Sequence, residues 1–488
     1  MSSETKVLGV VGAGPMGAGI AQVGLTSGLR VVLYDLSAEA LARAAQDIEG
    51  RIARMVEKGQ LGAGAVEDAR ARLTLAASIA DFAPCDFVVE AIIERLEPKQ
   101  ALFAELEAVI AEDAVLASNT SSLSVAAIAR NCRNKARVCG LHFFNPVPLM
   151  KLVEVIAAPG TDTATAERAT TLTKQLGKVP VAVRDGPGFL VNLQGRAYTT
   201  ECLALLQEQI AEPSVIDRIM KDGAGFRMGP FELLDLTGID VNYPVSVFIY
   251  EGYHHDPRLR TTAGHALMAD AGLYGRKVGR GFHDYGGDAP AYEPPVPSGR
   301  KLRPHFGEPS AHWAALGDVE AGEDVTLIAP LGEDCATACH RLGLDPASTV
   351  AIDFTGVERR HLTVMAAVGG HARAEDVADW LRGLGFGVEV IGDSPGFVLQ
   401  RVLSGIANLG CELAQMGVGT PADIDTAMKL AQNYPLGPFE WAQKLGLATV
   451  YTVMQQLQAI TGSDRYRPSL WLRRRTMLGL SPYTPDRS

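Results

Sequence analysis

The chain lacks the features that mark membrane, secreted and nucleic-acid-binding proteins. Among its 488 residues no apolar run reaches membrane-spanning length. Its 7 cysteines are an odd number scattered along a long chain, which favours a reducing compartment over a disulfide framework. Basic residues are fewer than acidic ones, and the formal net charge of −11 disfavours nucleic acid or an anionic membrane as a partner.

Targeting and metal-binding signals are also sparse. Met1 to Lys6 has no signal-peptide pattern, so we expect a cytoplasmic protein. Cys335, Cys339 and His340 lie close together, but no second ligand pair follows at usable spacing, and we expect no metal site. At this length, with 47% hydrophobic residues, the composition predicts a globular chain of about two to four domains.

A glycine-rich turn stands between two apolar runs at the N-terminus. Gly12, Gly14 and Gly17 form a G-x-G-x-x-G pattern after one run, and Asp35 ends the next run 18 positions after Gly17. These glycines permit a tight turn, close approach of a pyrophosphate, and close packing of a helix on a sheet. The helix start then binds the pyrophosphate and Asp35 binds a ribose hydroxyl. A purely structural turn is the alternative. Because a carboxylate repels a 2′-phosphate, we predict NAD rather than NADP.

Strand and helix signals alternate through the first part of the chain. Apolar runs at 86–91, 114–117 and 137–141 predict buried strands separated by helices, which indicates a doubly wound parallel sheet of Rossmann type. The pattern becomes helical from about residue 188. We therefore predict an α/β NAD-binding domain over residues 1–185 and an all-α domain over residues 186–285.

The helical domain recurs 208 positions later without a gap. Asp185-Gly186-Pro187-Gly188-Phe189 matches Asp393-Ser394-Pro395-Gly396-Phe397, and Gly229-Pro230-Phe231-Glu232 matches Gly437-Pro438-Phe439-Glu440. This predicts a second helical copy over residues 393–488. The proline- and glycine-rich stretch 286–322 predicts a linker. Residues 323–392 have strand-like runs but no glycine fingerprint, which predicts a degenerate, non-binding Rossmann-like segment.

His142 is the candidate proton acceptor. It stands at the C-terminal end of a predicted strand, where ligands bind in open α/β sheets. Removing a hydride from a secondary alcohol requires a base for the hydroxyl proton, and histidine has a suitable pKa. Glu154 lies in an apolar strand, where a carboxylate needs a partner, and pairing would fix the imidazole tautomer. A satisfied core histidine is the alternative interpretation.

Two further elements supply polar groups for a substrate oxygen. The run Ser118 to Ser124 follows a strand and opens a helix, so its hydroxyls cap the helix or bind a ligand. Asn192 lies in the first turns of the helical domain, where it could bind the same oxygen or form an interdomain structural bond.

Basic residues recur at helical spacing after Asp35. A solvated helix face is the favoured interpretation for each of them, although an anionic substrate would need a local basic patch in so acidic a chain. Lys58 is retained as a candidate substrate-binding residue. The set is Arg43, Arg51, Arg54 and Lys58.

The motifs together resemble those of the L-3-hydroxyacyl-CoA dehydrogenases. The resemblance covers residues 5–285 densely, and the duplicated helical domain extends it to the C-terminus. It is specific, because sugar-phosphate and 3-hydroxyisobutyrate dehydrogenases share the nucleotide fold but lack the His-Phe-Phe-Asn-Pro segment. The motifs that carry it lie at residues 12–21, 118–123, 142–148, 151–155, 187–189 and 229–232.

This resemblance implies NAD-dependent oxidation of a (3S)-hydroxyacyl-CoA to the 3-ketoacyl-CoA. It implies that His142 is the general base and Glu154 its partner. Ser121 and Asn192 would bind the 3-hydroxyl or 3-keto oxygen. One departure is that family members usually carry Asn-Arg after the Gly-Phe turn, whereas Leu193 follows Asn192 here.

The resemblance also implies further contacts with the cofactor. Glu94 and Lys99, which follow a predicted strand end, would line the cofactor and substrate cleft. Three other residues of the same motifs are expected at the cofactor, namely Met16, Asn119 and Asn145.

The length of the chain points to one branch of the family. A degenerate second unit after a proline-rich linker most resembles the long bacterial form found in aromatic catabolism, whose substrate is 3-hydroxyadipyl-CoA from phenylacetate breakdown. A 3-hydroxybutyryl-CoA or general β-oxidation dehydrogenase is the alternative. A dehydrogenase for free 3-hydroxy acids and a non-catalytic NAD(H)-binding structural protein are kept as further alternatives.

The second copy lacks the catalytic motif. The offset of 208 puts Gln400, Leu362 and Val350 at the positions of the oxygen-binding asparagine, the glutamate and the base. We therefore predict a non-catalytic copy that packs against the first helical domain. Single-copy relatives dimerise through that surface, so one chain would imitate a dimer. A homodimer of the whole chain and a hydratase or thiolase partner are kept as expectations.

Overall fold

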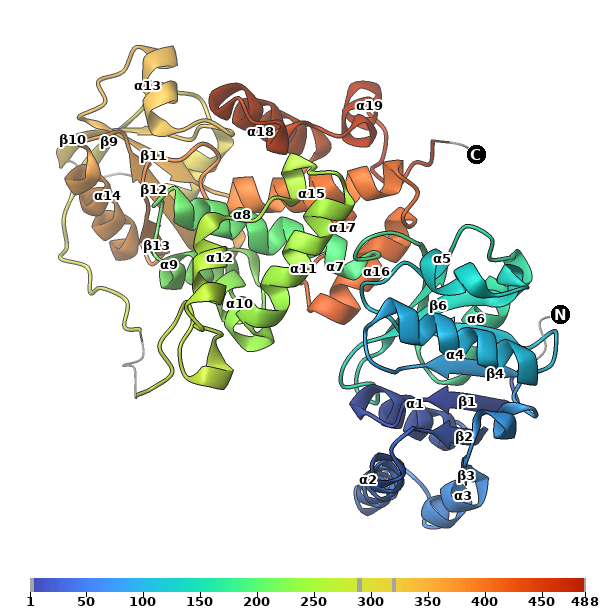
Figure 1. Ribbon diagram of the computed structural model, residues 1–488. Helices are drawn as coiled ribbons and strands as arrows, with labels where there is room; N and C mark the ends of the chain where they lie inside the picture. The colour runs from blue at the N-terminus through green and yellow to red at the C-terminus, as the bar shows by residue number, and fades with distance from the viewer. Residues whose placement is uncertain (1–3, 288–291, 318–321, 487–488) are drawn as a thin grey trace. The chain divides into compact units, whose positions relative to one another are not determined.

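The computed structural model describes residues 4–287, 292–317 and 322–486 (Figure 1). The chain divides into two compact units, Met1–Val191 with Gly417–Gln432, and Asn192–Met416 with Asn433–Ser488. The described part leaves out residues 1–3, which belong to the segment without a signal-peptide pattern. It also leaves out residues 288–291 and 318–321, which belong to the predicted linker. No helix in that part combines the length and hydropathy needed to span a bilayer.

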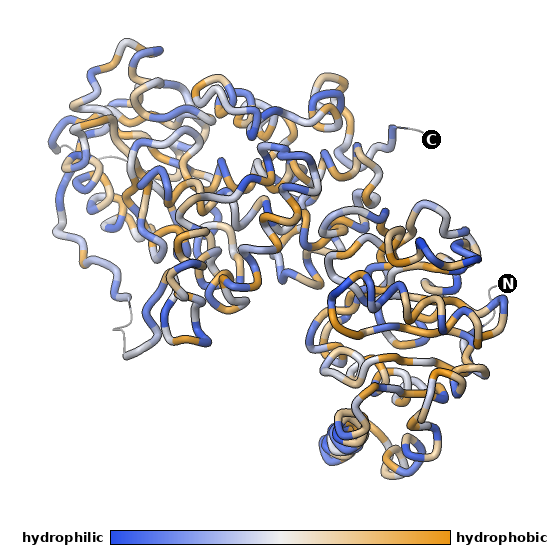
Figure 2. The backbone as a smooth tube through the Cα atoms, in the orientation of Figure 1, coloured by the Kyte–Doolittle hydropathy of each residue, from blue (hydrophilic) through white to orange (hydrophobic). Residues whose placement is uncertain are grey.

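Unit 1 is built on an eight-stranded sheet in the order β3-β2-β1-β4-β5-β6-β7-β8. Its central strands are short apolar runs buried on both faces, as parallel sheets require, and they appear as the hydrophobic stretches of the tube in Figure 2. The predicted Rossmann-type fold is confirmed. The strands are β1 (Val7–Val11), β2 (Arg30–Tyr34), β3 (Leu73–Leu75), β4 (Phe87–Glu90), β5 (Val115–Ser118), β6 (Val138–Phe143), β7 (Leu152–Ala157) and β8 (Val179–Arg184).

Helices α1 and α6 pack against this sheet, whereas α2 packs against α1 and α3. Helix α2 shows an amphipathic pattern clearly, because Leu41, Ala44, Ile48 and Ile52 recur at helical spacing and are buried while the opposite face is polar. The helices are α1 (Pro15–Thr26), α2 (Ala38–Glu57), α3 (Ala65–Arg72), α4 (Leu96–Val109), α5 (Val125–Ile128), α6 (Thr163–Gln175) and α16 (Pro421–Gln432).

One strand pair departs from the predicted parallel sheet. Strands β6 and β7 are antiparallel, whereas every other pair in the sheet is parallel. The connection between them, residues 144–151, is too short for a crossover, so the chain turns back beside its own strand. This reversal sets His142 directly opposite Glu154.

Unit 1 also contains a segment from the second helical copy. Residues Gly417–Gln432 group with unit 1, although the repeat predicted a single domain over residues 393–488. Helix α16 packs against β7 and β8, and the Arg184 amide donates to the Val418 carbonyl at 2.9 Å. The sequence repeat identifies homologous segments but not their neighbours in space.

Unit 2 contains a five-stranded sheet in the order β13-β12-β11-β10-β9. Strand β9 lies within the stretch predicted to be a linker, so that prediction is wrong there. Its Pro304 would interrupt an inner strand, but β9 is at the edge of the sheet, where proline is tolerated. The strands are β9 (Leu302–Phe306), β10 (Glu323–Ile328), β11 (Thr349–Asp353), β12 (His361–Ala366) and β13 (Gly387–Val390), with α13 (Cys335–Leu342) and α14 (His371–Gly383) between them.

The two helical copies have matching local structure and pack together within unit 2. Gly238 and Gly446 stand at the same place in the repeat and share a positive φ, of 90° and 86°. Helix α8 of the first copy packs against α15 of the second. The helices are α7 (Val191–Gln194), α8 (Arg196–Gln207), α9 (Pro213–Arg218), α10 (Pro230–Thr237), α11 (Ile239–Gly252), α12 (Ala263–Asp270), α15 (Leu399–Gln415), α17 (Pro438–Leu445), α18 (Leu447–Thr461) and α19 (Leu470–Leu478).

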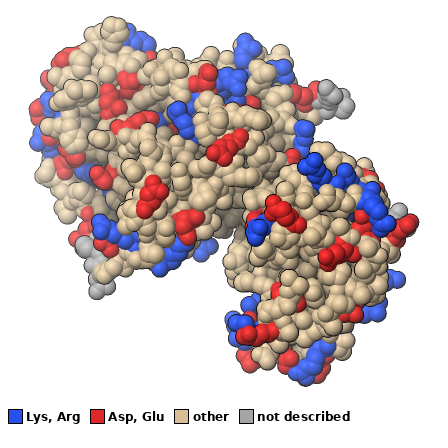
Figure 3. All heavy atoms as spheres, in the orientation of Figure 1, with Lys and Arg blue, Asp and Glu red and all other residues tan. Residues whose placement is uncertain are grey.

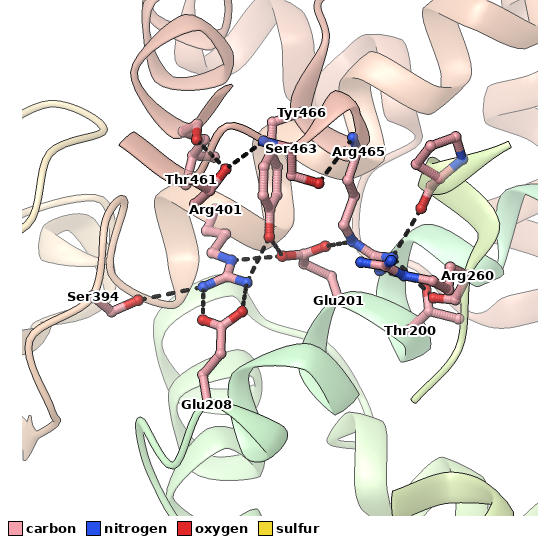
Figure 4. Close-up of polar contacts among 12 residues, drawn as sticks. Thr200, Glu201, Glu208, Arg260, Ser394, Arg401, Thr461, Ser463, Arg465 and Tyr466 are labelled. Carbon is pink, nitrogen blue, oxygen red and sulfur yellow. Dashed lines mark hydrogen bonds and ion pairs between the residues drawn. The ribbon is translucent and has the colours of Figure 1, made fainter. Parts of the chain in front are cut away.

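A buried ionic network joins the two copies (Figure 4). The Arg401 guanidinium, which is fully buried, binds both oxygens of Glu208 at 2.7 and 2.9 Å and also reaches Glu201. Arg465 binds the other oxygen of Glu201 at 2.6 Å, and the Tyr466 hydroxyl donates to Glu201 at 2.8 Å. The charges of Arg465 and Arg401 outweigh burial and lower the pKa of Glu201 to about 2.

Charged side chains of both signs are interspersed over the face shown in Figure 3. This agrees with a chain whose acidic excess is spread over many residues. All 7 cysteines are buried free thiols, and burial raises the pKa of Cys139 to about 12.

Candidate active site

The glycine turn after β1 has the geometry of a pyrophosphate cradle. Gly12 has a φ of 105°, and a side chain there would lie 2.4 Å from the Ala91 carbonyl oxygen. At Gly17 an added Cβ would lie 1.8 Å from the Gly12 oxygen, so the helix can approach the turn only with glycine. Gly14 faces open space and begins α1 without a side-chain cap. The first N–H groups of α1 are therefore available to an anion.

Asp35 lies beside this turn. Its two carboxylate oxygens accept hydrogen bonds from the Ala13 amide at 2.7 Å and the Ser37 amide at 2.9 Å, which fixes its orientation at the end of β2. A cavity of about 460 Å³ contains Gly12, Gly14 and Asp35 in its wall. The remaining wall is mostly apolar and suits an adenosine group. Met16 packs partly against the core beneath the turn.

A buried charged cluster connects β4 and β5 behind the cavity. Glu90 is fully buried and binds the Lys99 ammonium and the Ser118 hydroxyl, each at 2.6 Å. Lys99 is itself buried and also lies 3.3 Å from Glu94. Glu94 accepts hydrogen bonds from Thr120 at 2.6 Å and from the Ser121 amide at 2.9 Å. Although burial alone would raise the pKa of Glu94, these bonds and Lys99 lower it. The cluster shapes the loop after β5.

His142 and Glu154 form the central pair of the site. His142 Nδ1 lies 2.6 Å from Glu154 Oε2, and both side chains are buried. Glu154 Oε1 accepts hydrogen bonds from the Leu190 amide at 3.0 Å and the Val191 amide at 2.9 Å. Both backbone donors bind Oε1. With Glu154 as a carboxylate, Oε2 is an acceptor as well, so we assign the proton to His142 Nδ1. Nε2 is then the acceptor nitrogen that remains for a ligand.

Three of the other predicted residues, all of them polar, belong to unit 1, and Asn192 belongs to unit 2. Asn119 joins β5 to β6 through a 2.8 Å bond from the Phe143 amide, and Ser121 is exposed in the loop held by Glu94. Asn145 is exposed in the loop after β6. Asn192 is the first residue of unit 2 and is not among the residues that unit 1 brings together.

Lys58 lines a second cavity in unit 1. The cavity has a volume of about 490 Å³, and its wall includes Arg51, Arg54 and Asn145. Three of the four basic residues on this helical stretch therefore face one space, whereas Arg43 pairs with Glu39 on the helix surface. Arg54 and Lys58 are also exposed, so the solvated-face interpretation and a ligand-binding role both stay open for them.

Lys178 is a residue of the site region that the sequence did not reveal. Its ammonium donates to the carbonyls of Val147, Pro148 and Met150 at 2.6, 3.2 and 2.8 Å. Burial lowers its pKa. Its partners are backbone groups, so no sequence motif marks the interaction. Lys178 therefore holds the loop after β6. This loop contains Asn145 and forms part of the wall of the basic cavity.

Strand pairing corrects the residues assigned to the catalytic positions of the second copy. In the first sheet His142 pairs with Glu154, and Glu154 with Val181. Val181 corresponds to Glu389, which pairs with Thr363, and Thr363 pairs with Asp353. The extrapolation to Val350 and Leu362 is therefore wrong, because the lengths of the segments between the matched motifs differ.

The glycine turn, the aspartate at the end of β2 and the paired imidazole are together typical of an NAD-dependent dehydrogenase of the Rossmann class. Comparison with known proteins gives the family. The model of the 3-hydroxyacyl-CoA dehydrogenase NAD-binding domain matches residues 7–186. The model of the C-terminal domain of the same family matches residues 188–285 and again residues 396–482.

Individual relatives agree with these family matches. The chain is 38% identical to 3-hydroxyadipyl-CoA dehydrogenase of Escherichia coli strain K12 over 98% of this chain and 99% of that protein. It is 41% identical to a probable 3-hydroxybutyryl-CoA dehydrogenase of Deinococcus radiodurans, over 57% of this chain and 99% of that protein. A crystal structure described as 3-hydroxybutyryl-CoA dehydrogenase from Escherichia coli K12 has a TM-score of 0.88 and 38% identity, covering 98% and 99% of the two chains. The chain belongs to the 3-hydroxyacyl-CoA dehydrogenase family and is an NAD-dependent oxidoreductase.

Proposed function

We propose that His142 is the general base for oxidation of the 3-hydroxyl group of an acyl-CoA. The observation that carries this proposal is the 2.6 Å contact between His142 Nδ1 and Glu154, which leaves Nε2 as the acceptor. The histidine is the last residue but one of β6, at the carboxyl edge of the sheet, which is also the edge of the glycine turn and Asp35. This is the edge at which a nicotinamide and a substrate meet in such folds.

The pair would move one proton. NAD, held at the turn of Gly12 and Gly14 and at Asp35, would supply the hydride acceptor. His142 Nε2 takes the proton of the 3-hydroxyl as the carbonyl forms, and the ring becomes an imidazolium. Glu154 stabilises that charge through Nδ1. The amides of Leu190 and Val191 prevent Glu154 from turning away, so the base keeps its orientation between turnovers.

Ser121 and Asn192 are proposed to bind the 3-oxygen. Ser121 lies in a loop whose orientation depends on Glu94, which accepts from its amide at 2.9 Å. Lys99 is buried against Glu90 and Glu94, and we propose that it acts on the cofactor site by positioning Glu94. Met16, Asn119 and Asn145 remain proposed cofactor residues on the grounds of their motifs.

The basic cavity is proposed to bind the phosphates of CoA. Arg51, Arg54 and Lys58 line it, and none has an ion-pair partner among residues 4–287, 292–317 and 322–486. Three unpaired cations in an acidic protein favour an anionic ligand at this place. A free 3-hydroxy acid has a single carboxylate, whereas CoA has several phosphate charges, so three cations in one cavity favour the thioester.

We propose 3-hydroxyadipyl-CoA as the substrate. The support is the full-length relative of Escherichia coli that bears this name and spans both halves of the chain. A second candidate is 3-hydroxybutyryl-CoA. The similar crystal structure and the shorter relative are both described as dehydrogenases of this substrate. We further propose a cytoplasmic location, homodimers and a hydratase or thiolase partner; the free thiols favour a reducing compartment.

The test is NADH formation with (3S)-hydroxyadipyl-CoA, (3S)-hydroxybutyryl-CoA and free 3-hydroxybutyrate side by side. We expect turnover on the thioesters, a higher kcat/KM for the dicarboxylic substrate, and loss of turnover in His142→Ala. Undiminished turnover in His142→Ala, or a preference for the free acid, would contradict the proposal. NADH binding without turnover on any substrate would favour a structural nucleotide-binding protein.

A further inference from the structure

Unit 2 contains a cavity at the carboxyl ends of two strands of its own sheet. The cavity has a volume of about 260 Å³ and lies where β10 and β11 end. Its wall includes Asp353 of β11, Gln400 of α15 and Lys444 of α17. No G-x-G-x-x-G turn follows these strands, so the cavity is suited to a smaller ligand than NAD.

Asp353 has a carboxylate oxygen without a donor. The residue is 1% exposed, and its Oδ1 accepts from the Thr355 amide at 2.9 Å, the Thr355 hydroxyl at 2.6 Å and Gln400 at 3.1 Å. Its Oδ2 is buried and receives no hydrogen bond from the part of the chain that the structure describes. Burial raises the pKa of Asp353. A buried acceptor of this kind is costly unless water or a ligand supplies the donor.

The position of Asp353 in the sheet is that of the catalytic base in unit 1. Asp353 pairs with Thr363 across an antiparallel strand pair, as His142 pairs with Glu154. The Thr363 hydroxyl is also buried without a partner among the described residues. Gln400 occupies the place of Asn192 in the repeat. The cavity therefore lies at the place that the His142 site occupies in unit 1. Its polar groups are different, and they suit a ligand with a hydroxyl group.

The outer part of the cavity offers positive charge and apolar surface. Lys444 is 43% exposed and pairs with Glu358 at 2.9 Å, and Glu358 is itself 72% exposed, so an anion can replace it at little cost. His312 stacks on Phe354 with ring centroids 5.3 Å apart. Leu331 and Leu445 also line the cavity and give it apolar surface.

We propose that unit 2 binds a short hydroxy acid in this cavity. The ligand hydroxyl donates to Asp353 Oδ2, its carbon chain contacts Leu331 and Leu445, and its carboxylate meets Lys444 and His312. A hydroxyl donor, a short apolar body and an anionic end are what the inner oxygen, the walls and the rim require. This site is separate from the proposed catalytic site, and its occupancy does not depend on the reaction in unit 1.

The test is calorimetric titration of the full chain with (3S)-hydroxybutyrate as the probe. Butyrate, which lacks only the hydroxyl, is the matched ligand. We expect Asp353→Asn and Lys444→Met each to weaken binding of the hydroxy acid by about tenfold, since each removes one hydrogen-bonded or charged contact. Asp270→Asn, at an exposed position of unit 2, should leave it unchanged. His142→Gln distinguishes binding in unit 2 from binding in unit 1, because this substitution should not change the affinity of the unit 2 cavity for the probe.

Three results would overturn the proposal. In the first, butyrate binds as tightly as the hydroxy acid. In the second, Asp353→Asn binds the hydroxy acid as tightly as the original chain does. A crystal soaked in the probe could also hold only an ordered water at Asp353 Oδ2. If Asp353→Asn failed to fold, as thermal unfolding would reveal, Lys444→Met and the comparison of the two probes would still decide the question.

Discussion

The two α/β sheets share a framework and differ at the residues that bear chemistry. In both, an aspartate after the last strand accepts hydrogen bonds from the first amides of a short helix, Asp185 from Val125 and Ala126, and Asp393 from Cys335 and Ala336. In both, an antiparallel strand pair sets two polar residues face to face. The framework is therefore shared by both sheets even though the His142–Glu154 pair occurs in only one.

The differences lie at two places. The first sheet has the glycine turn and Asp35 beside its central strand, whereas the second begins with the edge strand β9. The first sheet has His142 and Glu154 at the paired positions, and the second has Asp353 and Thr363. A fold supplies the location of a site, and the side chains at a few register positions supply the reaction.

The largest effect is expected from removing the base. His142→Gln keeps a polar side chain but cannot accept the hydroxyl proton at neutral pH, so kcat/KM should fall by about 10²–10⁴-fold. NADH binding, measured by fluorescence, should remain because the cradle is made by other residues. His371→Gln, at an exposed position of unit 2, serves as the control. A residual activity close to that of the original chain would remove the main distinction between the two sheets.

Next in size is the network that joins the helical copies. Arg401 corresponds to Leu193 in the repeat, so only one of two equivalent positions has the arginine. Arg401→Leu leaves Glu201 and Glu208 without this partner and should lower the free energy of unfolding by about 3–5 kcal/mol in urea titrations. Arg473→Leu at an exposed position is the control. An unchanged midpoint would mean that apolar packing alone joins the copies.

The same network has a defined pH dependence. The pKa of Glu201 falls from 4.5 to about 2 in the folded chain, because Arg465 and Arg401 outweigh its burial. Its stabilising contribution is therefore complete above about pH 4.5 and is lost as the pH falls toward 2. Glu201→Gln should lose less stability over this range than the original chain does, relative to its own value at pH 7.

The sequence predicted the features that depend on local patterns. The glycine spacing with Asp35 identifies the nucleotide-binding domain, and the ungapped recurrence of Gly229-Pro230-Phe231-Glu232 identifies the helical repeat. His142 and Glu154 were paired on chemical grounds, because a carboxylate in an apolar strand needs a partner. Their 2.6 Å contact agrees with that argument.

Features that depend on three-dimensional neighbours could not be predicted. The edge strand β9 contains Pro304 and is flanked by loop residues, so its local pattern resembles a linker. Helix α16 belongs to unit 1 through packing that no repeat records. Lys178 binds backbone carbonyls, which every residue has. The equivalence of Asp353 to His142 required strand register, since segment lengths between the motifs differ.

A moderate effect is expected at Lys178, which corresponds to Phe386 in the second half. In the first half the ammonium binds three loop carbonyls, whereas Phe386 lies under Arg360 at 4.4 Å. Lys178→Met should lower the free energy of unfolding by about 1–3 kcal/mol and raise the KM for the acyl-CoA more than it lowers kcat. Lys174→Met, on the exposed side of α6, is the control. Unchanged KM would separate this loop from substrate binding.

The smallest effect concerns the capping aspartate that both halves share. Burial raises the pKa of Asp393 from 3.8 to about 6. The folded chain then holds this proton more tightly than the unfolded chain, so the contribution is present below about pH 3.8 and is lost as the pH rises through 6. Asp393→Asn should change stability at pH 7 by about 1 kcal/mol or less but should flatten its decline between pH 4 and 6. Asp185→Asn is the matched cap removal in the first half. Identical pH profiles for the original chain and Asp393→Asn would contradict the raised pKa of Asp393.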